Sequence, residues 1–321
     1  MPIDRDAVLR ILARERLSID AAAPGRTTFL SHLGAMGKLT PGPWIAHREL
    51  LNSLTRTNLS PDQRHSLAQA VLIDYEREFG VGRLVLQALP SGLPCGGASL
   101  ALRPRGGAPR CLYTWALGSG AKPTPCDWLL LRAQPEWADE KATPLLASDL
   151  KTLHALGADV AIFVPSAVAA VQVAELCLQG IPFTAHPRFL PLLSGTDNDA
   201  KIALWPIDAV PSASLRRRRV SSVIIVDGGE LATRAIGRWA ATRSDTREAE
   251  TGRPNEIEIS EVCCPGRADR SALLRFWEAC ERPSILLRGD PTWTGAGQTW
   301  LSACGAHVDL QAESTQLRLF E

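Results

Sequence analysis

The amino-acid sequence predicts an α/β protein with a helical N-terminal module, a β-rich middle module and a C-terminal domain built on a doubly wound parallel sheet. Three patterns predict this order. Apolar residues recur at helical spacing up to about residue 80, short strands follow, and strands alternate regularly with helices after Pro144. We therefore expect the domains 1–80, 81–140 and 141–321.

The 321 residues are 45% hydrophobic and 21% charged, enough to bury a sizeable core in more than one domain. The formal net charge of +1 gives no general attraction for nucleic acid, so such binding needs a local basic patch. The apolar runs are shorter than the roughly 18 residues of a membrane helix, and charges interrupt the start of the chain where a signal peptide is apolar. These features predict a cytoplasmic protein without a membrane segment.

The eight cysteines are dispersed along the chain, and no Cys-x-x-Cys pair occurs. A disulfide scaffold of a small secreted domain has a denser and more regular spacing. The cysteines between 263 and 304, together with His307, match no zinc-binding pattern. We expect buried free thiols and no metal site.

Within 1–80 the apolar residues from Val8 to Ile19 form a helical stripe. The run "SPDQRHSLAQAVLIDYEREFG" predicts a further helix, with Ser60 as N-cap, Pro61 at the first helical position and Gly80 as terminator. After residue 82 the runs "RLVLQAL", "ASLALRP", "RCLYTWAL" and "DWLLLRA" are separated by Gly and Pro clusters. They predict a mostly antiparallel meander.

Beyond Pro144 strands such as "ADVAIFV", "KIALWPI" and "VSSVIIVD" alternate with amphipathic helices. This alternation indicates a parallel sheet covered on both faces, because right-handed crossovers place the helices there. Ligands of such sheets bind beyond the carboxyl ends of the strands. Ser166 and Asp227 stand at such ends and are our first candidates for a nucleotide or phosphate site.

The segments "VAIFVPSAVAAVQVAELCLQGIPFTAH", "AKIALWPIDAV" and "VSSVIIVDGGELATRAIGRWAATR" together resemble the second RecA-like motor lobe of superfamily-two helicases, over residues 158–243. The resemblance implies a RecA-like sheet, with Ser166 in the first segment. It also implies that Gly237 and Arg238 belong to the helix that supplies an arginine to the ATP phosphates. Arg243 follows Arg238 by five residues, where the family has its second arginine three residues on, and "ALWPIDAV" lacks the family's Thr and Gly-Asp elements.

An ATPase also needs a glycine-rich loop, a lysine and an acidic residue for magnesium. The run "RGDPTWTGAGQT" leads from a strand into a predicted helix 298–304, so Gly295, Gly297 and the amides of Gln298 and Thr299 are candidates to hold an anion at the helix N-terminus. Gln298 stands where such a loop has its lysine. The other glycine-rich run, "GSGAKPT" around Lys122, predicts only a turn. We therefore expect no autonomous ATP hydrolysis.

A run of four arginines in "LRRRRVSS" precedes the Asp227 strand and is the best local candidate for contact with nucleic-acid phosphates. Its members are Arg216, Arg217, Arg218 and Arg219. A charge run of this kind is also common on a solvated face. Arg26 and His32 have a spacing that occurs in some helical ribonucleases, and Tyr113 and Trp115 belong to the meander, as hydrophobic face or as a stacking surface for bases.

Together these patterns favour a non-autonomous, helicase-like subunit in DNA or RNA processing, with mobile-element and defence assemblies as settings. The expected partners are DNA or RNA and a protein; the patterns identify no cofactor, and a nucleotide is a candidate ligand. A second hypothesis is a phosphoribosyltransferase-like enzyme, because such enzymes hold a sugar phosphate after a strand like "VIIVD"; here Gly228 replaces the second acidic residue. A third is a catalytically inactive scaffold subunit.

Overall fold

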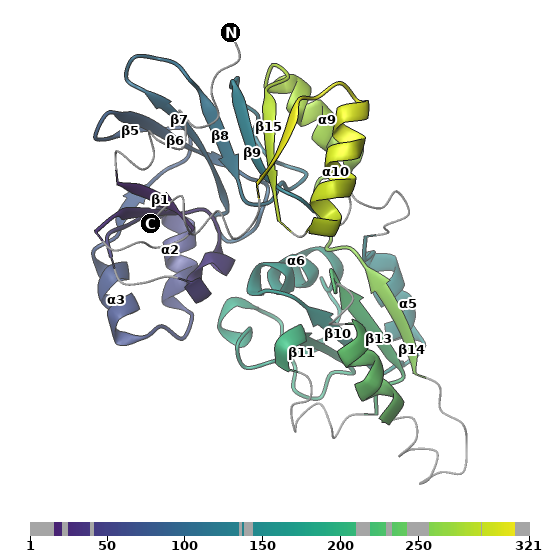
Figure 1. The fold of residues 1–321 in the computed structure, drawn as a ribbon. Coiled ribbons are helices and arrows are strands. Elements are labelled where there is room, and N and C mark those ends of the chain that lie inside the picture. Colours follow the sequence, from purple (N-terminus) through teal and green to yellow (C-terminus); the bar gives the residue numbers. More distant parts are fainter. Residues whose placement is uncertain are drawn as a thin grey trace. The chain divides into compact units, whose positions relative to one another are not determined.

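The computed structural model describes residues 16–20, 25–38, 42–134, 137, 144–209, 219–228, 233–242, 257–289 and 291–311. The chain forms two compact units (Figure 1). Unit 1 consists of Met1–Lys141 and Gly266–Glu321, and unit 2, Ala142–Pro265, is inserted between these two segments. This grouping differs from the expected domains 1–80, 81–140 and 141–321, because the last strands of the chain pair with the middle of unit 1 and not with unit 2.

Unit 1 contains a seven-stranded mixed sheet of order β16-β15-β9-β8-β7-β6-β5. Its strands are β5 (Glu78–Val81), β6 (Leu84–Pro90), β7 (Ala98–Pro104), β8 (Cys111–Thr114), β9 (Trp128–Arg132), β15 (Ser284–Arg288) and β16 (Val308–Gln311). Strands β6 to β8 are antiparallel, as the meander pattern predicts, and β5 extends this antiparallel part from residues that were expected to be helical. The last strand of the predicted meander, β9, is instead parallel to β8, and β8, β9, β15 and β16 are mutually parallel. Helices α9 (Arg270–Ala279) and α10 (Pro291–Ala303) cover one face through an apolar cluster that includes Leu273 and Leu287.

A second sheet covers the other face of the large one, and its four parallel strands have the order β1-β2-β3-β4. They are β1 (Leu17–Ile19), β2 (Thr27–Leu30), β3 (Trp44–His47) and β4 (Val71–Ile73), with the 3₁₀-helix η1 (Leu33–Lys38) and helices α2 (Arg48–Thr55) and α3 (Pro61–Ala68). The helical module predicted for 1–80 is therefore wrong within the described residues. Strands of three or four residues are too short to show their own periodicity, so the apolar residues at 17 and 19 read as part of a helical stripe.

The helix predicted from Ser60 is present, with Pro61 in its first turn and a full capping box between Ser60 and Gln63. It ends at Ala68, well before Gly80, which lies in β5. Residues 1–15, which include Val8, lie outside the described ranges. The capping chemistry thus located the start of the helix correctly, while the apolar residues beyond it belong to strand β4.

Unit 2 is an α/β unit around a five-stranded parallel sheet of order β11-β12-β10-β13-β14. Its elements are α5 (Ala147–Ala155), β10 (Val160–Val164), α6 (Ala167–Cys177), β11 (Phe183–Ala185), η2 (Leu190–Leu192), β12 (Ile202–Pro206), η3 (Ile207–Ala209), β13 (Ser222–Val226), a helix over 233–242 and β14 (Glu258–Val262). The predicted α/β class with a parallel sheet is confirmed here. The chain leaves β10 toward one side of the sheet and β13 toward the other, so the order reverses between these two strands.

Within the described ranges, no helix combines the length and the apolar composition needed to cross a membrane.

The N-cap of α9 gives a first prediction. The Asp269 carboxylate accepts hydrogen bonds from the Ala272 amide (2.7 Å) and the Ser271 hydroxyl (2.8 Å), and these bonds lower the pKa of Asp269. Asp269→Ala should reduce the free energy of unfolding by about 1 kcal/mol at neutral pH. Because the folded-state pKa is depressed, this stabilisation is present at neutral pH and is lost as the pH falls through the lowered pKa.

Urea unfolding at pH 7 and at about pH 2.5 measures the difference between the two proteins, which should shrink at the lower pH. The control Asp269→Asn keeps a side-chain acceptor and should lose only a few tenths of a kcal/mol at pH 7. A difference that grows at low pH would contradict the assignment.

Candidate functional site

The candidate site lies in unit 1, where the parallel strands β8, β9 and β15 end at a common edge of the sheet. Alternate residues of a strand share a face. Tyr113, Leu130 and Leu286 all belong to the apolar cluster between the seven-stranded sheet and the four-stranded sheet, which we call the small sheet. Two positions further along β9 and β15, the same face carries Arg132 and Arg288. These two arginines are register partners on neighbouring strands, so their Cα atoms lie about 4.8 Å apart.

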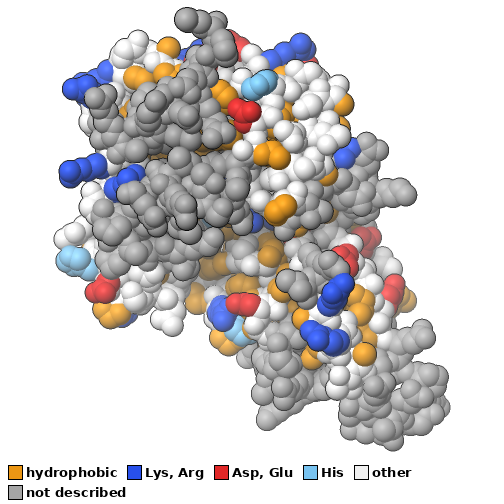
Figure 2. Space-filling model, viewed as in Figure 1, with side chains coloured by type: hydrophobic (Ala, Val, Ile, Leu, Met, Phe, Trp, Pro, Cys, Tyr) orange, Lys and Arg blue, Asp and Glu red, His pale blue; other side chains and the backbone are white. Residues whose placement is uncertain are grey.

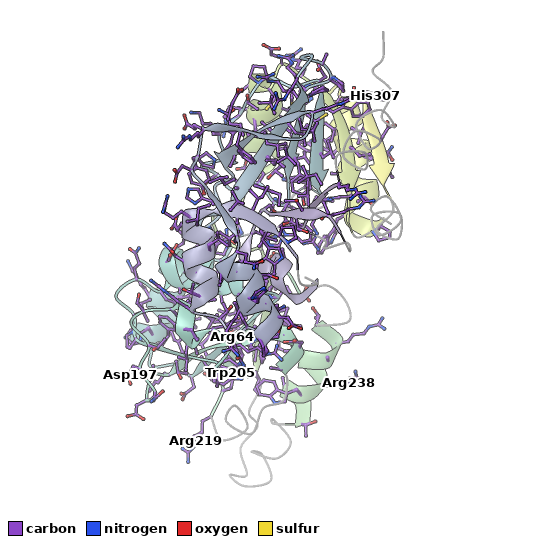
Figure 3. All side chains as sticks on the ribbon, turned by 90° about the vertical axis from the view of Figure 1, so that its left-hand side faces the viewer. Arg64, Asp197, Trp205, Arg219, Arg238 and His307 are labelled. Carbon is purple, nitrogen blue, oxygen red and sulfur yellow. The ribbon has the colours of Figure 1, made fainter. Side chains whose placement is uncertain are left out.

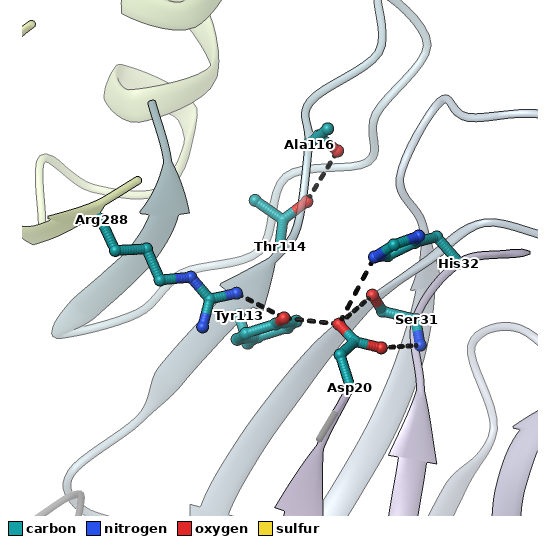
Figure 4. A network of polar contacts seen from close by, with 7 residues as sticks. All are labelled: Asp20, Ser31, His32, Tyr113, Thr114, Ala116 and Arg288. Carbon is teal, nitrogen blue, oxygen red and sulfur yellow. Dashed lines mark hydrogen bonds and ion pairs between the residues drawn. The ribbon is translucent and has the colours of Figure 1, made fainter. Parts of the chain in front are cut away.

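The small sheet brings a carboxylate to this edge (Figure 4). Asp20 follows β1 with a φ of 56°, a left-handed conformation that Asp adopts more readily than most residues. Its Oδ1 accepts the Ser31 amide (2.7 Å), and its Oδ2 accepts the hydroxyls of Ser31 (2.5 Å) and Tyr113 (2.5 Å). The His32 ring nitrogen Nε2 lies 4.0 Å from the same oxygen.

Tyr113 links this carboxylate to Arg288. Its hydroxyl accepts a hydrogen bond from the Arg288 guanidinium while it donates to Asp20, and the guanidinium carbon lies 4.5 Å from the centre of the Tyr113 ring. Tyr113 is 1% exposed, and this burial is the main cause that raises its pKa, with the Asp20 charge adding to the rise and Arg288 opposing it. The phenol therefore remains protonated, which suits a donor and excludes a phenolate nucleophile.

The Trp115 ring, directly after β8, contacts His32 and both arginines. The His32 ring stacks on it with centroids 4.4 Å apart and planes 28° apart. The guanidinium carbon of Arg132 lies 4.4 Å from the Trp115 ring and that of Arg288 lies 5.7 Å from it. We call Trp115, His32, Arg132 and Arg288 the Trp115 cluster. Trp115 and Arg132 are partly exposed, while His32 and Arg288 are buried.

The buried polar atoms near this edge for which the described residues supply no hydrogen-bond partner include Nε of Arg288 and Oε1 of Gln134. Gln134 is 2% exposed and follows Arg132 by two residues, and its amide nitrogen donates to the Leu117 carbonyl (3.4 Å). Buried polar groups are almost always paired in folded proteins. A donor and an acceptor left over at one strand edge are therefore an indication of a polar ligand.

In unit 2 the structure does bring Ser166 and Asp227 to one edge, where β10 and β13 end side by side. Both side chains serve the fold. The Ser166 hydroxyl caps α6 by accepting the Ala169 amide (3.2 Å), and Asp227 Oδ1 accepts the Cys264 amide (3.0 Å). A side chain at Gly228 would collide with Cγ2 of Ile225, so the second acidic residue of the phosphoribosyltransferase pattern has no room there.

Arg219 and Arg238, two described candidates of unit 2, are exposed. Gly237 and Arg238 lie in the helix 233–242, with the Arg238 side chain in solvent. Arg219 precedes β13, at the opposite end of that strand from Asp227, and its side chain extends outward from the sheet (Figure 3). Arg216, Arg217 and Arg218 lie outside the described residues. On the described part of the face in Figure 2, Lys and Arg side chains lie scattered among Asp and Glu and form no single basic surface.

The predicted anion site at Gly295, Gly297, Gln298 and Thr299 is wrong. Helix α10 begins at Pro291, so these residues lie inside the helix, where amides bond to carbonyls of the preceding turn. The Thr299 hydroxyl donates to the Gly295 carbonyl (3.0 Å), and the Gln298 amide donates to the Val308 carbonyl (3.1 Å). Gly297 allows close packing instead, because a Cβ there would lie 3.0 Å from Leu287.

The remaining predictions concern the Lys122 turn, the spacing of Arg26 and His32, and the cysteines. The run around Lys122 does contain a turn, closed by the bond from the Ala121 amide to the Gly118 carbonyl (3.1 Å). Lys122 follows this turn and forms a surface ion pair with Glu76 (2.6 Å). Arg26 directly precedes strand β2 and His32 lies two residues after it, so the helical ribonuclease spacing does not apply. The eight cysteines are all free thiols, six of them buried. Among the described residues, no three His, Cys, Asp or Glu side chains are arranged to hold a metal ion.

Sequence reasoning missed Asp20, Arg132 and Arg288. The one available signal was that "LLLR" and "ILLR" both end a strand with arginine, a charge at the end of an apolar run. Their proximity follows only from the pairing of β9 with β15, which are separated by the whole of unit 2.

No protein-family model and no curated protein matches the chain. Among solved structures it is similar to a protein of unknown function from Enterococcus faecalis V583, with a TM-score of 0.50 and 15% sequence identity. The match covers 82% of this chain and 74% of that chain. At this identity the likeness concerns the fold alone.

The Asp20 network gives the second prediction. Asp20→Asn should lower the free energy of unfolding by about 3 kcal/mol, because the amide nitrogen cannot accept the hydrogen bonds that one carboxylate oxygen now accepts. The matched control is Ser18→Ala in the same small sheet. It removes a neutral hydroxyl that contacts the Thr28 hydroxyl (2.9 Å) and donates to the Thr27 carbonyl (3.4 Å), and it should cost about 1 kcal/mol. Urea unfolding followed by tryptophan fluorescence measures both. Equal losses of free energy of unfolding in the two variants would contradict the conclusion that the Asp20 carboxylate contributes more than one buried hydrogen bond.

Proposed function

We propose that unit 1 binds a phosphate-bearing ligand, a nucleotide or one residue of a nucleic-acid strand, at the Trp115 cluster. The observation that carries the proposal is the register pairing of Arg132 with Arg288 beside one partly exposed tryptophan ring. Guanidinium groups bind phosphate through two parallel hydrogen bonds, and an indole ring stacks on a base. The combination favours a ligand that carries both groups.

The position in the fold supports the same conclusion. Parallel strands direct their carboxyl ends to one edge, and ligands of α/β sheets bind at such edges. Arg288 is held by Tyr113, and Tyr113 is held by Asp20, so the guanidinium has its orientation before any ligand arrives. A preorganised cation loses less conformational entropy on binding than a mobile surface arginine does.

The wider role proposed for the chain is a non-autonomous, helicase-like subunit in DNA or RNA processing. The ligand class proposed for unit 1 is in line with it, and the parallel sheet of unit 2 is compatible with a RecA-like lobe. Arg216 to Arg219 remain the proposed contact with nucleic-acid phosphates in unit 2. The phosphoribosyltransferase alternative loses support from the lack of space at Gly228.

Calorimetric titration of the full chain with ATP, AMP and inorganic phosphate tests the site. Arg132→Gln should weaken the binding of all three probes by about tenfold or more, since a hydrogen bond to a charged group contributes about 1.5–3 kcal/mol. Trp115→Leu should weaken binding of AMP and ATP but leave inorganic phosphate unchanged, because only the nucleotides have a base to stack.

The matched control is Arg103→Gln. Arg103 is an arginine of the same sheet, but it lies near the carboxyl end of the antiparallel strand β7, at the opposite edge, and pairs with Glu78 (3.1 Å). It should leave all affinities unchanged. Absence of binding for every probe, or an equal loss with Arg103→Gln, would refute the proposal. A single-stranded oligonucleotide whose binding depends on Arg216 to Arg219 and not on Arg132 would assign strand contact to unit 2.

We also expect the purified chain to hydrolyse ATP no faster than buffer. Gly297 and Thr299 lie within α10, where their amides are used by the helix, and the Gln298 side chain bonds to the Val308 carbonyl. No amide cradle with a lysine is therefore formed by this segment. Phosphate release is measured with and without magnesium. Turnover that disappears on Gly297→Ala would contradict this expectation.

A further inference from the structure

Unit 2 contains a cavity of about 390 Å³ between helix α6 and the chain that follows the 3₁₀-helix η2. Small-molecule sites in proteins have volumes of about 300–1,000 Å³, so this cavity is large enough for an organic ligand. The apolar part of its lining is formed by Val171, Ala174, Leu178, Phe183, Leu192 and Leu193. A ligand in this cavity therefore meets a largely hydrocarbon surface.

Two glycines of the lining border open space. Gly180 and Gly195 both have a φ of 75°, a left-handed conformation that favours glycine. A Cβ atom built at either position would meet no atom of another part of the chain within 4 Å. The Asp197 amide donates to the Phe183 carbonyl (2.7 Å), which ties the chain after Gly195 to strand β11. The fold thus holds the wall of the cavity in place and leaves the space beside both glycines open.

The carbonyl end of helix α6 forms one side of the cavity. The last four carbonyls of a helix have no partner inside the helix, and they carry the negative end of its dipole. The amides of Leu178 and Ile181 do not satisfy them, because Leu178 donates to the Val173 carbonyl (3.2 Å) and Ile181 donates to the Leu178 carbonyl (3.0 Å). Helix α6 also has no basic residue in its last turn. This side of the cavity therefore has a negative partial charge.

Glu175 adds a full negative charge to the same side. It lies in the last turn of α6, it is exposed, and it belongs to the lining of the cavity. A carboxylate near the C-terminus of a helix is repelled by the helix dipole, so this position does not stabilise the helix. None of the residues that line the cavity is a lysine, an arginine or a histidine. The cavity thus combines apolar walls with negative charge at one side.

We propose that this cavity binds a small organic amine with an apolar body, whose ammonium group lies against Glu175 and the carbonyl end of α6. Helix C-termini and carboxylates both favour a cation. The apolar lining covers the hydrocarbon or aromatic part of the ligand, which is favourable because that surface leaves water. Mostly apolar walls with a few polar groups that fix the orientation are typical of small-molecule sites. The site belongs to unit 2 and does not depend on the phosphate site proposed for unit 1.

Three probes with the same aromatic ring separate the effect of charge from that of apolar contact. At neutral pH 2-phenylethylamine is a cation, 2-phenylethanol is neutral and 3-phenylpropanoate is an anion. Each is titrated into the full chain labelled with nitrogen-15 glycine, and proton–nitrogen correlation spectra are recorded. The amides of Gly180 and Gly195 report on the cavity, and that of Gly82 in unit 1 is the internal control.

We expect the amine to shift the Gly180 and Gly195 signals in a saturable way and to leave the Gly82 signal unchanged. It should bind about three- to tenfold more tightly than the alcohol, because the carboxylate and the helix end each favour a cation. The anion should cause no shift. Raising the salt concentration should weaken the binding of the amine and leave that of the alcohol unchanged.

Variants test the two parts of the site separately. Glu175→Gln keeps the shape of the side chain and should weaken the amine by up to about fivefold without changing the alcohol. The matched control is Glu261→Gln, a change at an exposed glutamate of β14 on the opposite edge of the same sheet, which should alter neither affinity. Ala174→Leu extends a lining side chain into the cavity and should weaken the amine and the alcohol alike.

Two results on the unaltered chain would overturn the proposal, whether or not a variant folds. One is that the amine causes no saturable shift at Gly180 and Gly195. The other is that the amine binds no more tightly than the alcohol or the anion, which would show that the cavity does not select a positive charge.

Discussion

The buried carboxylate of Asp20 is the interaction on which the arrangement of unit 1 depends. It sits between two sheets and accepts hydrogen bonds from Ser31 on one side and Tyr113 on the other. A buried charge is stable only when nearby groups replace the water it has lost. Here the amide and the two hydroxyls supply that replacement, and Arg288 supplies the opposite charge through Tyr113.

This requirement fixes where the small sheet can lie. A shift of β1 relative to β8 by one residue would leave the carboxylate without its partners and would also turn the apolar residues Leu17 and Ile19 away from the core. The Ser31 carbonyl adds a direct backbone bond to the large sheet by accepting the Ala98 amide (2.8 Å). The same contacts that hold the sheets together therefore also aim Arg288 at the strand edge.

The insertion of unit 2 separates the two strands that create the candidate site. Strand β9 comes before unit 2 and β15 comes after it, yet their five residues pair in register from Trp128 to Arg132. The polar residues of unit 2 that looked most like a nucleotide site, Ser166 and Asp227, are used to cap a helix and to fix the turn after β14. The chemistry that the structure favours thus resides in unit 1.

The local structure follows from the amino-acid sequence wherever a pattern extends over enough residues. The alternation of strands and helices after Pro144, the antiparallel strands β6 to β8 and the N-cap at Ser60 all follow from periodicity and capping chemistry. Periodicity fails for β1 to β4, because strands of three or four residues show too few alternations to be told from a helical stripe. The sequence also predicts a loop up to Gly297, whereas the structure has these glycines inside helix α10.

The choice of neighbouring strands, by contrast, is made in the folded chain as a whole. Arg132 and Arg288 each end an apolar run, and nothing in either run identifies the other, since strand pairing depends on long-range packing of side chains across the sheet. Asp20 offered no signal either, because its role arises from a hydroxyl on a strand of another sheet, 93 residues away. The amino-acid sequence therefore determined the elements of this protein, and the burial of charge between two sheets decided where its candidate site lies.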